Sequence, residues 1–252
     1  MTTIERISPE NTSSLSPVYK EVFSGNPWYE ERICSGARLN GEEKCAVQYT
    51  SRAVPTDYAW KFDKDKGTGV RGESAGLEKC VACERDLIEF YPDFVNQNDL
   101  IKEALGEQGF IGFLLRDSNQ QPFGFSWGYK TPQNRTVSVN FPLVRPLLAS
   151  RGIDQDKTFY WAELGIVDKK QGSGFGLLAS AMQLKEAKRE GYQSFVVRTK
   201  NERVLSILKR IFSGKTAERL FADPEKETPW YGGNFQDANM EEISKILKKS
   251  RR

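Results

Sequence analysis

Residues 159–198 read FYWAELGIVDKKQGSGFGLLASAMQLKEAKREGYQSFVVR, and this stretch decides the fold. It opens and closes with short apolar runs that are typical of buried strands, at Phe159–Val167 and Ser194–Arg198. Between them, a glycine-rich turn at Gln171–Gly176 leads into a helical pattern over Phe175–Glu190, which ends at a glycine. A strand, turn, helix and strand in this order predict a crossover unit with a parallel strand pair.

Weaker patterns extend this unit in both directions. They predict two more helices, at Glu202–Phe212 and Asp99–Leu105, and a β-hairpin of Phe110–Arg116 with Pro122–Tyr129. They also predict an N-terminal strand at Ile4–Ile7, followed by a helix. Ser14 or Ser16 would cap the N-terminal helix, and Pro17 suits its first turn. Three prolines make Thr131–Lys157 a long connection, of a length that is usually functional when ordered.

The glycine turn lies where a strand leads into a helix. There, unpaired backbone N–H groups and the positive end of the helix dipole point outward together, which favours phosphate binding. Gly172, Gly174 and Gly176 let an anion approach the backbone closely; the alternative is a tight turn that needs glycine only for a positive φ. A dinucleotide-binding fingerprint is disfavoured, because the third glycine comes one residue early and the next strand ends in Arg198-Thr199-Lys200. Gly214-Lys215-Thr216 resembles the end of a Walker loop but follows a helix, not a strand.

The chain has 252 residues and no histidine. This excludes Ser-His-Asp and Cys-His nucleophiles and histidine zinc ligands, so proton transfer must use carboxylate, Tyr, Lys, Cys or water. With 37 Lys and Arg against 34 Asp and Glu, the net charge of +3 does not favour nucleic acid as a partner. No stretch is apolar over the roughly 18 residues of a membrane span, and the polar N-terminus lacks a signal peptide's apolar core. We therefore expect a cytoplasmic protein in a reducing compartment.

One segment of the sequence resembles a known family. GIVDKKQGSGFGLLASAM is similar to the acyl-coenzyme A binding motif of the GNAT N-acetyltransferase superfamily, Q/R-x-x-G-x-G/A, which Gln171, Gly174 and Gly176 match at every defined position. Pro17–Trp28 resembles the first helix and substrate-side loop of that superfamily, and Asn201–Val204 resembles the start of the helix after its fifth strand. The resemblance covers more than half of the chain. It implies an α/β (α+β) fold with a mixed, splayed central sheet flanked by helices.

The resemblance also implies how acetyl-coenzyme A would bind, with its pantetheine arm in the gap between the two strands of the crossover unit. The residues that it implies for the arm and the pyrophosphate are Ile166, Val167, Gln171, Gly172, Ser173, Gly174, Phe175, Gly176 and Asn201. The amine would enter from the opposite side, near Pro27-Trp28-Tyr29 and Thr131–Lys157. The identity of the acceptor depends on such loops, Phe221–Phe235 among them, and their composition does not name it.

Acetyl transfer from a thioester needs a neutral amine, and Glu163 is our candidate base. Strand alternation puts Glu163 on the face of Phe159, Trp161, Gly165 and Val167, where apolar neighbours would raise the pKa of its carboxyl. The alternative is a salt-bridged or solvent-facing glutamate.

The departing thiolate needs a proton, and the superfamily often supplies it from a tyrosine seven residues after the motif's asparagine. Counting from Asn201 gives Leu208, so the tyrosine is absent from that position. Tyr231, in the segment Pro229–Gly233, is the candidate acid that we expect to reach the site from the C-terminal strands. Core packing of Tyr231, with protonation by water, is the alternative.

All four cysteines lie in a polar segment of the chain. Cys80 and Cys83 form a C-x-x-C knuckle, and Cys34 and Cys45 stand upstream with ten residues between them. Four thiolates make a complete tetrahedral zinc set, and because no histidine exists, a zinc ion would use all four and be structural. Free or redox-active thiols and two disulfides are the alternatives.

Together these patterns predict one acetyltransferase-like domain over residues 1–252, with a Cys-rich insertion at 31–98 and a basic tail at 240–252. We expect the run Lys245–Arg252 at its end to be a solvated, frayed helix end. The predicted activity is acetyl-coenzyme A-dependent N-acetylation of a small-molecule or peptide amine by direct attack. The alternative is a zinc-stapled module that binds coenzyme A as a sensor with little or no catalysis. Neither nucleic acid nor a membrane is expected as a partner, and the oligomeric state is open.

Overall fold

The computed structural model describes residues 2–25, 28, 30–38, 45–50, 68–71, 76–136, 139–212 and 217–249. The chain forms two compact units, Met1–Leu15 with Leu100–Arg252, and Ser16–Asp99. The insertion predicted at 31–98 lies within the second unit. Parts of five sequence predictions lie outside the described residues: Pro27 and Tyr29 of the substrate-side loop, 39–44, 51–67 and 72–75 of the insertion, 137–138 of the long connection, the segment 214–216, and the basic end 250–252.

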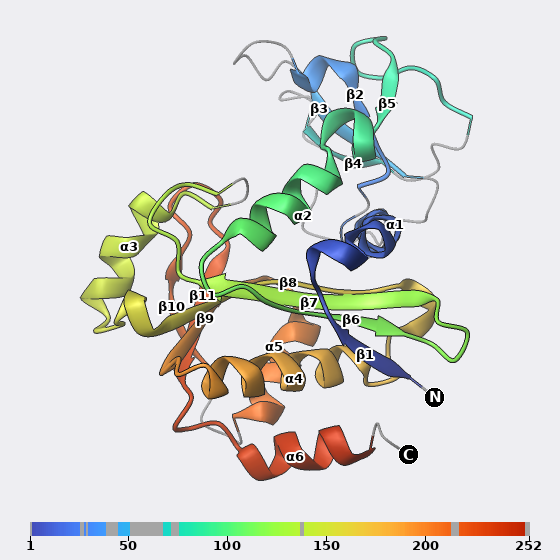
Figure 1. The fold of residues 1–252 in the computed structure, drawn as a ribbon. Coiled ribbons are helices and arrows are strands. Elements are labelled where there is room, and N and C mark those ends of the chain that lie inside the picture. The colour runs from blue at the N-terminus through green and yellow to red at the C-terminus, as the bar shows by residue number, and fades with distance from the viewer. Residues whose placement is uncertain are drawn as a thin grey trace. The chain divides into compact units, whose positions relative to one another are not determined.

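A seven-stranded mixed sheet is the centre of the larger unit (Figure 1). Its strands, in spatial order, are β1 (Thr3–Arg6), β6 (Ile111–Arg116), β7 (Pro122–Lys130), β8 (Thr158–Ile166), β9 (Ser194–Arg198), β11 (Pro229–Asn234) and β10 (Glu218–Ala222). All neighbours are antiparallel except β8 and β9, which are parallel. The predicted hairpin and the predicted crossover unit are both confirmed.

Strands β8 and β9 separate partway along their length. Among the described residues, their register covers only Thr158–Tyr160 against Ser194–Val196. Beyond Tyr160, β8 continues to Ile166 beside β7 alone, while β9 pairs with β11 along its other edge. The mixed, splayed sheet that was expected is therefore present.

Helices cover one face of this sheet (Figure 1). α4 (Phe175–Arg189) packs against β6, β7 and β8, α5 (Glu202–Ile211) lies beside α4, and α6 (Met240–Lys249) packs on both helices. The core between helices and sheet is apolar, with large aromatic side chains supplied by the strands, including Phe159, Trp161 and Phe195. Burial of these rings stabilises the larger unit.

Helix α3 (Phe141–Ser150) lies in the stretch that was predicted as a long connection. Pro142 stands in its first turn, where a missing N–H costs nothing, but Pro146 lies inside the helix. Interior prolines argue against a helix, and for this reason the sequence did not predict α3. Tertiary packing overrides that preference, because the ring of Phe141 contacts the rings of Tyr160 and Trp230 at centroid distances of 5.1 and 6.1 Å.

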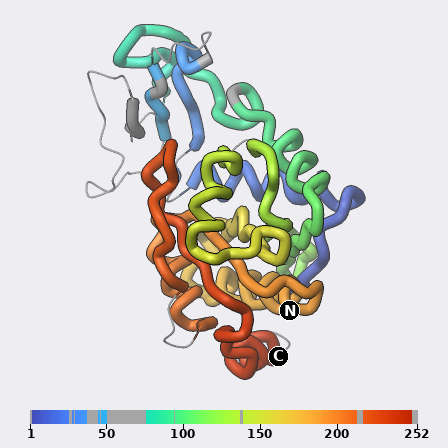
Figure 2. Tube along the Cα trace, turned by 90° about the vertical axis from the view of Figure 1, so that its left-hand side faces the viewer, coloured from blue at the N-terminus to red at the C-terminus, as the bar shows by residue number. Residues whose placement is uncertain are grey.

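This aromatic packing defines the second face of the sheet. Tyr160 also contacts Tyr129 and Trp230, at centroid distances of 5.6 and 5.5 Å, and Trp230 stacks on Phe221. Figure 2 shows the segment between β7 and β8, which holds α3, in the foreground beside β10 and β11. A hydrogen bond of 2.8 Å from Asn140 to Glu225 joins the two segments.

Both ends of the chain differ from the prediction. α1 runs over Thr12–Phe23, so Pro17 lies inside it and neither Ser14 nor Ser16 is its cap. A 3₁₀ turn at Pro9–Asn11 precedes α1 and starts the helical path earlier than expected. The described part of the tail forms α6 up to Lys249 and is not wholly solvated, because its Ile243, Ile246 and Leu247 recur at helical spacing and are buried against the core.

The smaller unit contains a four-stranded sheet in the order β4 (Thr68–Arg71), β3 (Ala46–Tyr49), β2 (Arg32–Cys34) and β5 (Leu87–Glu89). One cluster of buried residues at this sheet consists of three cysteines with Val47, Tyr49 and Leu87. Further buried apolar residues of this unit are Val18, Tyr19, Val22, Phe23, Ile33, Phe90 and Tyr91. Helix α2 (Gln97–Gly106) contains the boundary between the two units. Of the helices described, none has the length and apolar character that a membrane crossing requires.

Short helical turns complete the structure. Ser35–Arg38 follows β2 and Phe90–Phe94 follows β5. Gln155–Lys157 precedes β8 and Asp168–Lys170 follows it.

Candidate active site

The glycine turn connects the free end of β8 to the N-terminus of α4. Gly172 and Gly174 have φ of +76° and +83°, a conformation that favours glycine, and Gly174 is the N-cap of α4. The first helical bond of α4 runs from Leu178 N–H to Gly174 O, at 3.0 Å, so the N–H groups of residues 175–177 precede it. The turn is solvent-exposed at Gly172, Ser173 and Gly174. It therefore presents backbone donors at the positive end of a helix, an arrangement that attracts anions.

Gln171 ties this turn to its neighbours. Its Nε2 donates to Ile166 O at 2.9 Å and to Asp168 Oδ1 at 3.0 Å, and its Oε1 accepts from Arg203 Nη1. The side chain of Gln171 thus connects the end of β8 to the first turn of α5. It also places a guanidinium beside the glycine turn.

The sequence did not predict Arg203 as a site residue. The helix dipole disfavours a cation in a first helical turn, and a cation there can therefore indicate an anion nearby. This is the signal that could have found Arg203.

The two predicted residues at the end of β8 differ in what their backbones can do. Val167 N–H donates to Phe123 O at 3.0 Å, and Val167 O accepts from Lys170 N–H at 2.9 Å. Since hydrogen-bonded sides alternate along an antiparallel strand, Ile166 N–H points away from β7, toward the gap beside β9. Of these two residues, Ile166 is therefore the one whose N–H faces the gap. Both backbone groups of Val167 have partners within the chain, and its pairing with the pantetheine arm stays a prediction.

Asn201 is the N-cap of α5. Its Oδ1 accepts from Arg203 N–H at 2.9 Å, and its own N–H donates to Thr199 Oγ1 at 2.9 Å. These bonds fix Asn201 at the end of β9, on the other side of the gap from Ile166. Asn201 therefore lies at the end of β9, the strand that borders the gap opposite β8.

Glu163 lies on the opposite sheet face from the one predicted, because β8 contains a β-bulge. Trp161 pairs with Gly128 and Glu163 pairs with Trp127, so Ala162 is an extra residue. The inserted residue reverses the alternation. Trp161 packs against α4, whereas Glu163, half-buried, shares the face of its partner Trp127.

Two buried tyrosines share this face with Glu163. Burial raises the pKa of both Tyr129 and Tyr160, and the negative charge of Glu163 adds to the rise in each case. Tyr160 is also the last residue of β8 that pairs with β9. Glu163 is therefore three residues beyond the point where the strands separate, with neutral phenols nearby.

Tyr231 does not share a face with Glu163. It pairs with Val197 and packs, half-buried, against the core beneath α4 and α5. Leu208 is buried in that same core. A role for Tyr231 as an acid stays a prediction.

The four cysteines of the smaller unit meet in one cluster. Their sulfur atoms all lie within 4.8 Å of one another, with Cys34 Sγ 3.4 Å from Cys83 Sγ and Cys45 Sγ 3.5 Å from Cys80 Sγ. A tetrahedral zinc with Zn–S bonds of about 2.3 Å needs sulfur atoms about 3.8 Å apart. The observed spacing fits such an ion. It also excludes the S–S bonds of two disulfides, which are about 2 Å long.

Hydrogen bonds favour a thiolate at Cys80. Burial alone would raise the pKa of Cys80, but the Tyr49 hydroxyl, 3.2 Å from Sγ, and the backbone of Ala82 lower it to about 7. Burial raises the pKa of Cys34, and it raises that of Cys45 to about 11. A metal ion bound by the sulfur atoms would offset the effect of burial on these pKa values, because metal ligation stabilises thiolates. The donor set therefore fits zinc chemically as well as geometrically.

No protein-family model and no curated protein matches this sequence.

Solved structures to which the chain is similar include acetyltransferases. The PaiA N-acetyltransferase of Thermoplasma acidophilum in complex with coenzyme A has 9% identity and a TM-score of 0.46, over 93% of this chain and 99% of that chain. A GNAT-family acetyltransferase of Staphylococcus aureus has 7% identity and a TM-score of 0.44, over 93% and 99%. The ribosomal-protein-S18-alanine N-acetyltransferase of Escherichia coli has 7% identity and a TM-score of 0.42, over 92% and 91%. These likenesses are distant, so the functional assignment rests on the geometry of the site.

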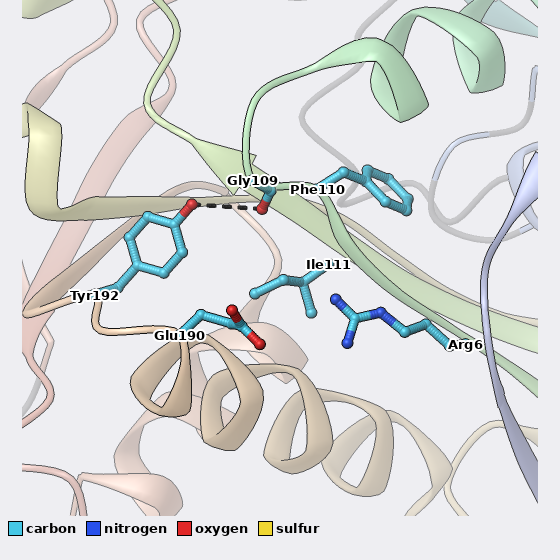
Figure 3. A pocket seen from close by; sticks show the side chains of 6 residues that line it. All are labelled: Arg6, Gly109, Phe110, Ile111, Glu190 and Tyr192. Atoms are coloured by element: carbon cyan, nitrogen blue, oxygen red, sulfur yellow. Dashed lines mark hydrogen bonds between the residues drawn. The ribbon is translucent and has the colours of Figure 1, made fainter.

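A separate hollow of about 250 Å³ lies at the other end of α4 (Figure 3). It is lined by Arg6, Gly109, Phe110, Ile111, Glu190 and Tyr192. The Tyr192 hydroxyl closes one side by donating to Gly109 O at 3.4 Å. None of the predicted site residues reaches this hollow, and the gap beside β8 remains the candidate active site.

Proposed function

We propose that this protein is a GNAT-type N-acetyltransferase that transfers an acetyl group from acetyl-coenzyme A to an amine. The observation that carries the proposal is the separation of β8 from β9 beyond Tyr160, with the glycine turn and the N-terminus of α4 at the open end. A gap between parallel strands exposes backbone groups that an extended ligand can use. The helix terminus at its mouth suits the phosphates of such a ligand.

Different residues would bind different parts of acetyl-coenzyme A. Ile166 N–H faces the gap and would pair with the pantetheine arm, while residues 172–176 would hold the pyrophosphate through backbone N–H groups. Arg203, fixed by Gln171, adds a positive charge beside the turn. Asn201 would contact the arm from the β9 side.

Glu163 is the proposed base. The amine nitrogen attacks the thioester carbonyl carbon, the C–S bond breaks, and Glu163 takes the proton that the nitrogen loses, directly or through water. The coenzyme thiolate then takes a proton from water or from Tyr231. The fold places Glu163 beyond the splay point with its carboxylate on the face of Trp127. We propose a small-molecule or peptide amine as the acceptor, and a reducing cytoplasmic compartment as the place where the enzyme works, because thiols persist there.

The activity test measures coenzyme A release from acetyl-coenzyme A with a panel of small and peptide amines. Glu163→Gln should lower kcat by about 100-fold or more, because general base catalysis contributes about that much. Glu218→Gln, a matched change at an exposed strand glutamate of β10, should leave kcat unchanged. Unchanged turnover in Glu163→Gln refutes the base assignment. Tight coenzyme binding without turnover of any amine by the unaltered protein favours the sensor alternative instead.

We also infer that Cys34, Cys45, Cys80 and Cys83 hold one structural zinc ion. A closed set of four thiolates leaves no coordination position for a substrate, so the ion would stabilise the smaller unit and take no part in transfer.

Metal analysis of the purified protein tests the zinc site. We expect one zinc per chain, lost in Cys34→Ser and retained in Val81→Ala, which changes an exposed residue at the tip of the same knuckle. Protein purified under reducing conditions without stoichiometric zinc would favour free thiols.

A further inference from the structure

A buried polar network lies directly behind the bulge in β8. Trp161 Nε1–H donates to Ser126 Oγ at 3.0 Å, and the Ser126 hydroxyl has two acceptors within reach, Gln183 Oε1 and Glu163 O, the latter at 3.2 Å. Gln183 Nε2 in turn donates to Ile111 O at 3.2 Å. Ser126 and Gln183 are 0% exposed and Trp161 is 2% exposed. Every member therefore depends on the others for its hydrogen bonds.

The network connects three elements at the one point where the strand ladder is irregular. Ser126 comes from β7, Gln183 from α4 and Trp161 from β8, one residue before the extra residue Ala162. A bulge interrupts the regular ladder, and the backbone around it needs other partners. The carbonyl of Glu163 itself is one of the two acceptors that the Ser126 hydroxyl reaches, at 3.2 Å.

The bulge also determines the direction of the Glu163 side chain. Without Ala162 as an extra residue, Glu163 would lie on the face of Trp161, against α4, because a shift of one residue exchanges the two faces of a strand. With the bulge, the carboxylate lies on the face of Trp127. Whatever holds the bulge in place therefore holds the carboxylate in place.

We propose that Ser126, supported by Trp161 and Gln183, is a positioning residue that fixes the β8 bulge and thereby aims Glu163 at the attacking amine. This inference rests on the proposed function, in which Glu163 is the base. Ser126 lies on the opposite face from the carboxylate and acts only through the backbone of Glu163.

A double-mutant cycle tests the proposal. Ser126→Ala removes the hydroxyl and should lower kcat by about 10- to 100-fold, because a small displacement of a catalytic group costs that much. The KM for acetyl-coenzyme A should change less than about twofold, since the coenzyme residues are untouched. In the Glu163→Gln background, Ser126→Ala should lower kcat less than about twofold further, because its effect passes through Glu163. Equal fold losses in the two backgrounds would overturn the proposal.

Thr158→Val is the matched control. Like Ser126→Ala, it removes a fully buried hydroxyl, but this one is on β8 and bonds Asp154 O and Ser194 outside the bulge. We expect its effect on kcat to be the same in both backgrounds.

Amide hydrogen exchange separates failure of this proposal from failure of the proposed function. Ser126→Ala should accelerate exchange at residues 162–164 by about tenfold or more, and Thr158→Val should not. If the unaltered protein turns over no amine, the acetyltransferase assignment fails, and the exchange result still decides whether Ser126 holds the bulge. Unchanged exchange in Ser126→Ala overturns the proposal whatever the activity.

Discussion

At the scale of single residues, the glycine turn makes the sharpest demand on the sequence. Gly174 has φ of +83°, and a Cβ there would meet no described heavy atom within 4 Å, so conformation and not crowding requires glycine. The open space in front of its Cα is where an anion would approach the backbone. Gly174→Ala should therefore weaken binding of coenzyme A by about tenfold or more and reduce stability by about 1 kcal/mol. Calorimetry of coenzyme A binding and thermal unfolding measure the two effects.

Gly152 provides the control for this prediction. It has φ of +71° after α3, also with no described atom within 4 Å of its Cβ position. Gly152→Ala should cost similar stability and leave coenzyme A affinity unchanged. Equal affinities in all three proteins would show that the turn does not contact the coenzyme.

Residue-scale prediction succeeded where chemistry is local and failed where it depends on a partner strand. The glycines of the turn were predictable, because a positive φ and a strand-to-helix junction leave a mark in the sequence itself. The four cysteines were predictable as one cluster by their number and the polar segment around them. The face of Glu163 was not, because Ala162 becomes an extra residue only in its pairing with Trp127 and Gly128.

At the scale of elements, a buried ion pair fixes the C-terminal strands. Asp223, 4% exposed, accepts from Trp230 Nε1 at 3.1 Å and from Arg198 at 3.2 Å, which joins the β10–β11 turn to the end of β9. Burial alone would raise the pKa of Asp223, but hydrogen bonds from Trp230 and the backbone of Glu225, with the charge of Arg198, lower it below its ordinary value of 3.8. The folded state therefore binds fewer protons than the unfolded state at acidic pH. The stability that this carboxylate adds is fully present above its ordinary pKa of 3.8 and is lost as pH falls through its pKa in the folded state.

Asp223→Asn tests this pair. At neutral pH the substitution should lower the free energy of unfolding by about 1–3 kcal/mol, because it removes a charge-assisted partner of Arg198. The difference from the parent should stay constant at pH values well above 3.8 and shrink as pH falls from there through the folded pKa, where the parent's carboxyl becomes protonated too. Urea unfolding across this range measures it, with Glu218→Gln as an exposed control. A difference that does not change with pH would contradict the lowered pKa.

Elements with strong periodicity were predicted within one or two residues, and those held by tertiary contacts were not. β8, β9, α4 and α5 match their sequence patterns, since apolar spacing and a terminal glycine define them locally. α3 contradicts its own composition and exists because Phe141 packs on Tyr160 and Trp230. The splay between β8 and β9 came from the family resemblance, because no local pattern records where two strands stop pairing.

At the scale of the whole molecule, the two units differ in what holds them together. The larger unit has an extensive apolar core beneath a seven-stranded sheet. The four-stranded sheet of the smaller unit packs on a cluster in which three buried cysteines lie beside Val47, Tyr49 and Leu87, and the sulfur atoms of all four cysteines lie within 4.8 Å of one another. A small sheet with such a core needs another source of stability, and a metal is one. The units should therefore respond differently to loss of zinc.

Removal of zinc by a strong chelator should unfold the smaller unit selectively. Amide hydrogen exchange should lose protection at residues 32–34, 46–49 and 87–89, because the ion's binding energy is folding energy for these strands. Residues 111–116 and 122–130 should keep theirs, and binding of coenzyme A should persist, because the glycine turn belongs to the larger unit. Cys80→Ser should reproduce the chelator's effect without added chelator. Loss of protection in both units together would mean that the smaller unit is required for the fold of the larger, and unchanged protection in both would remove zinc as the source of its stability.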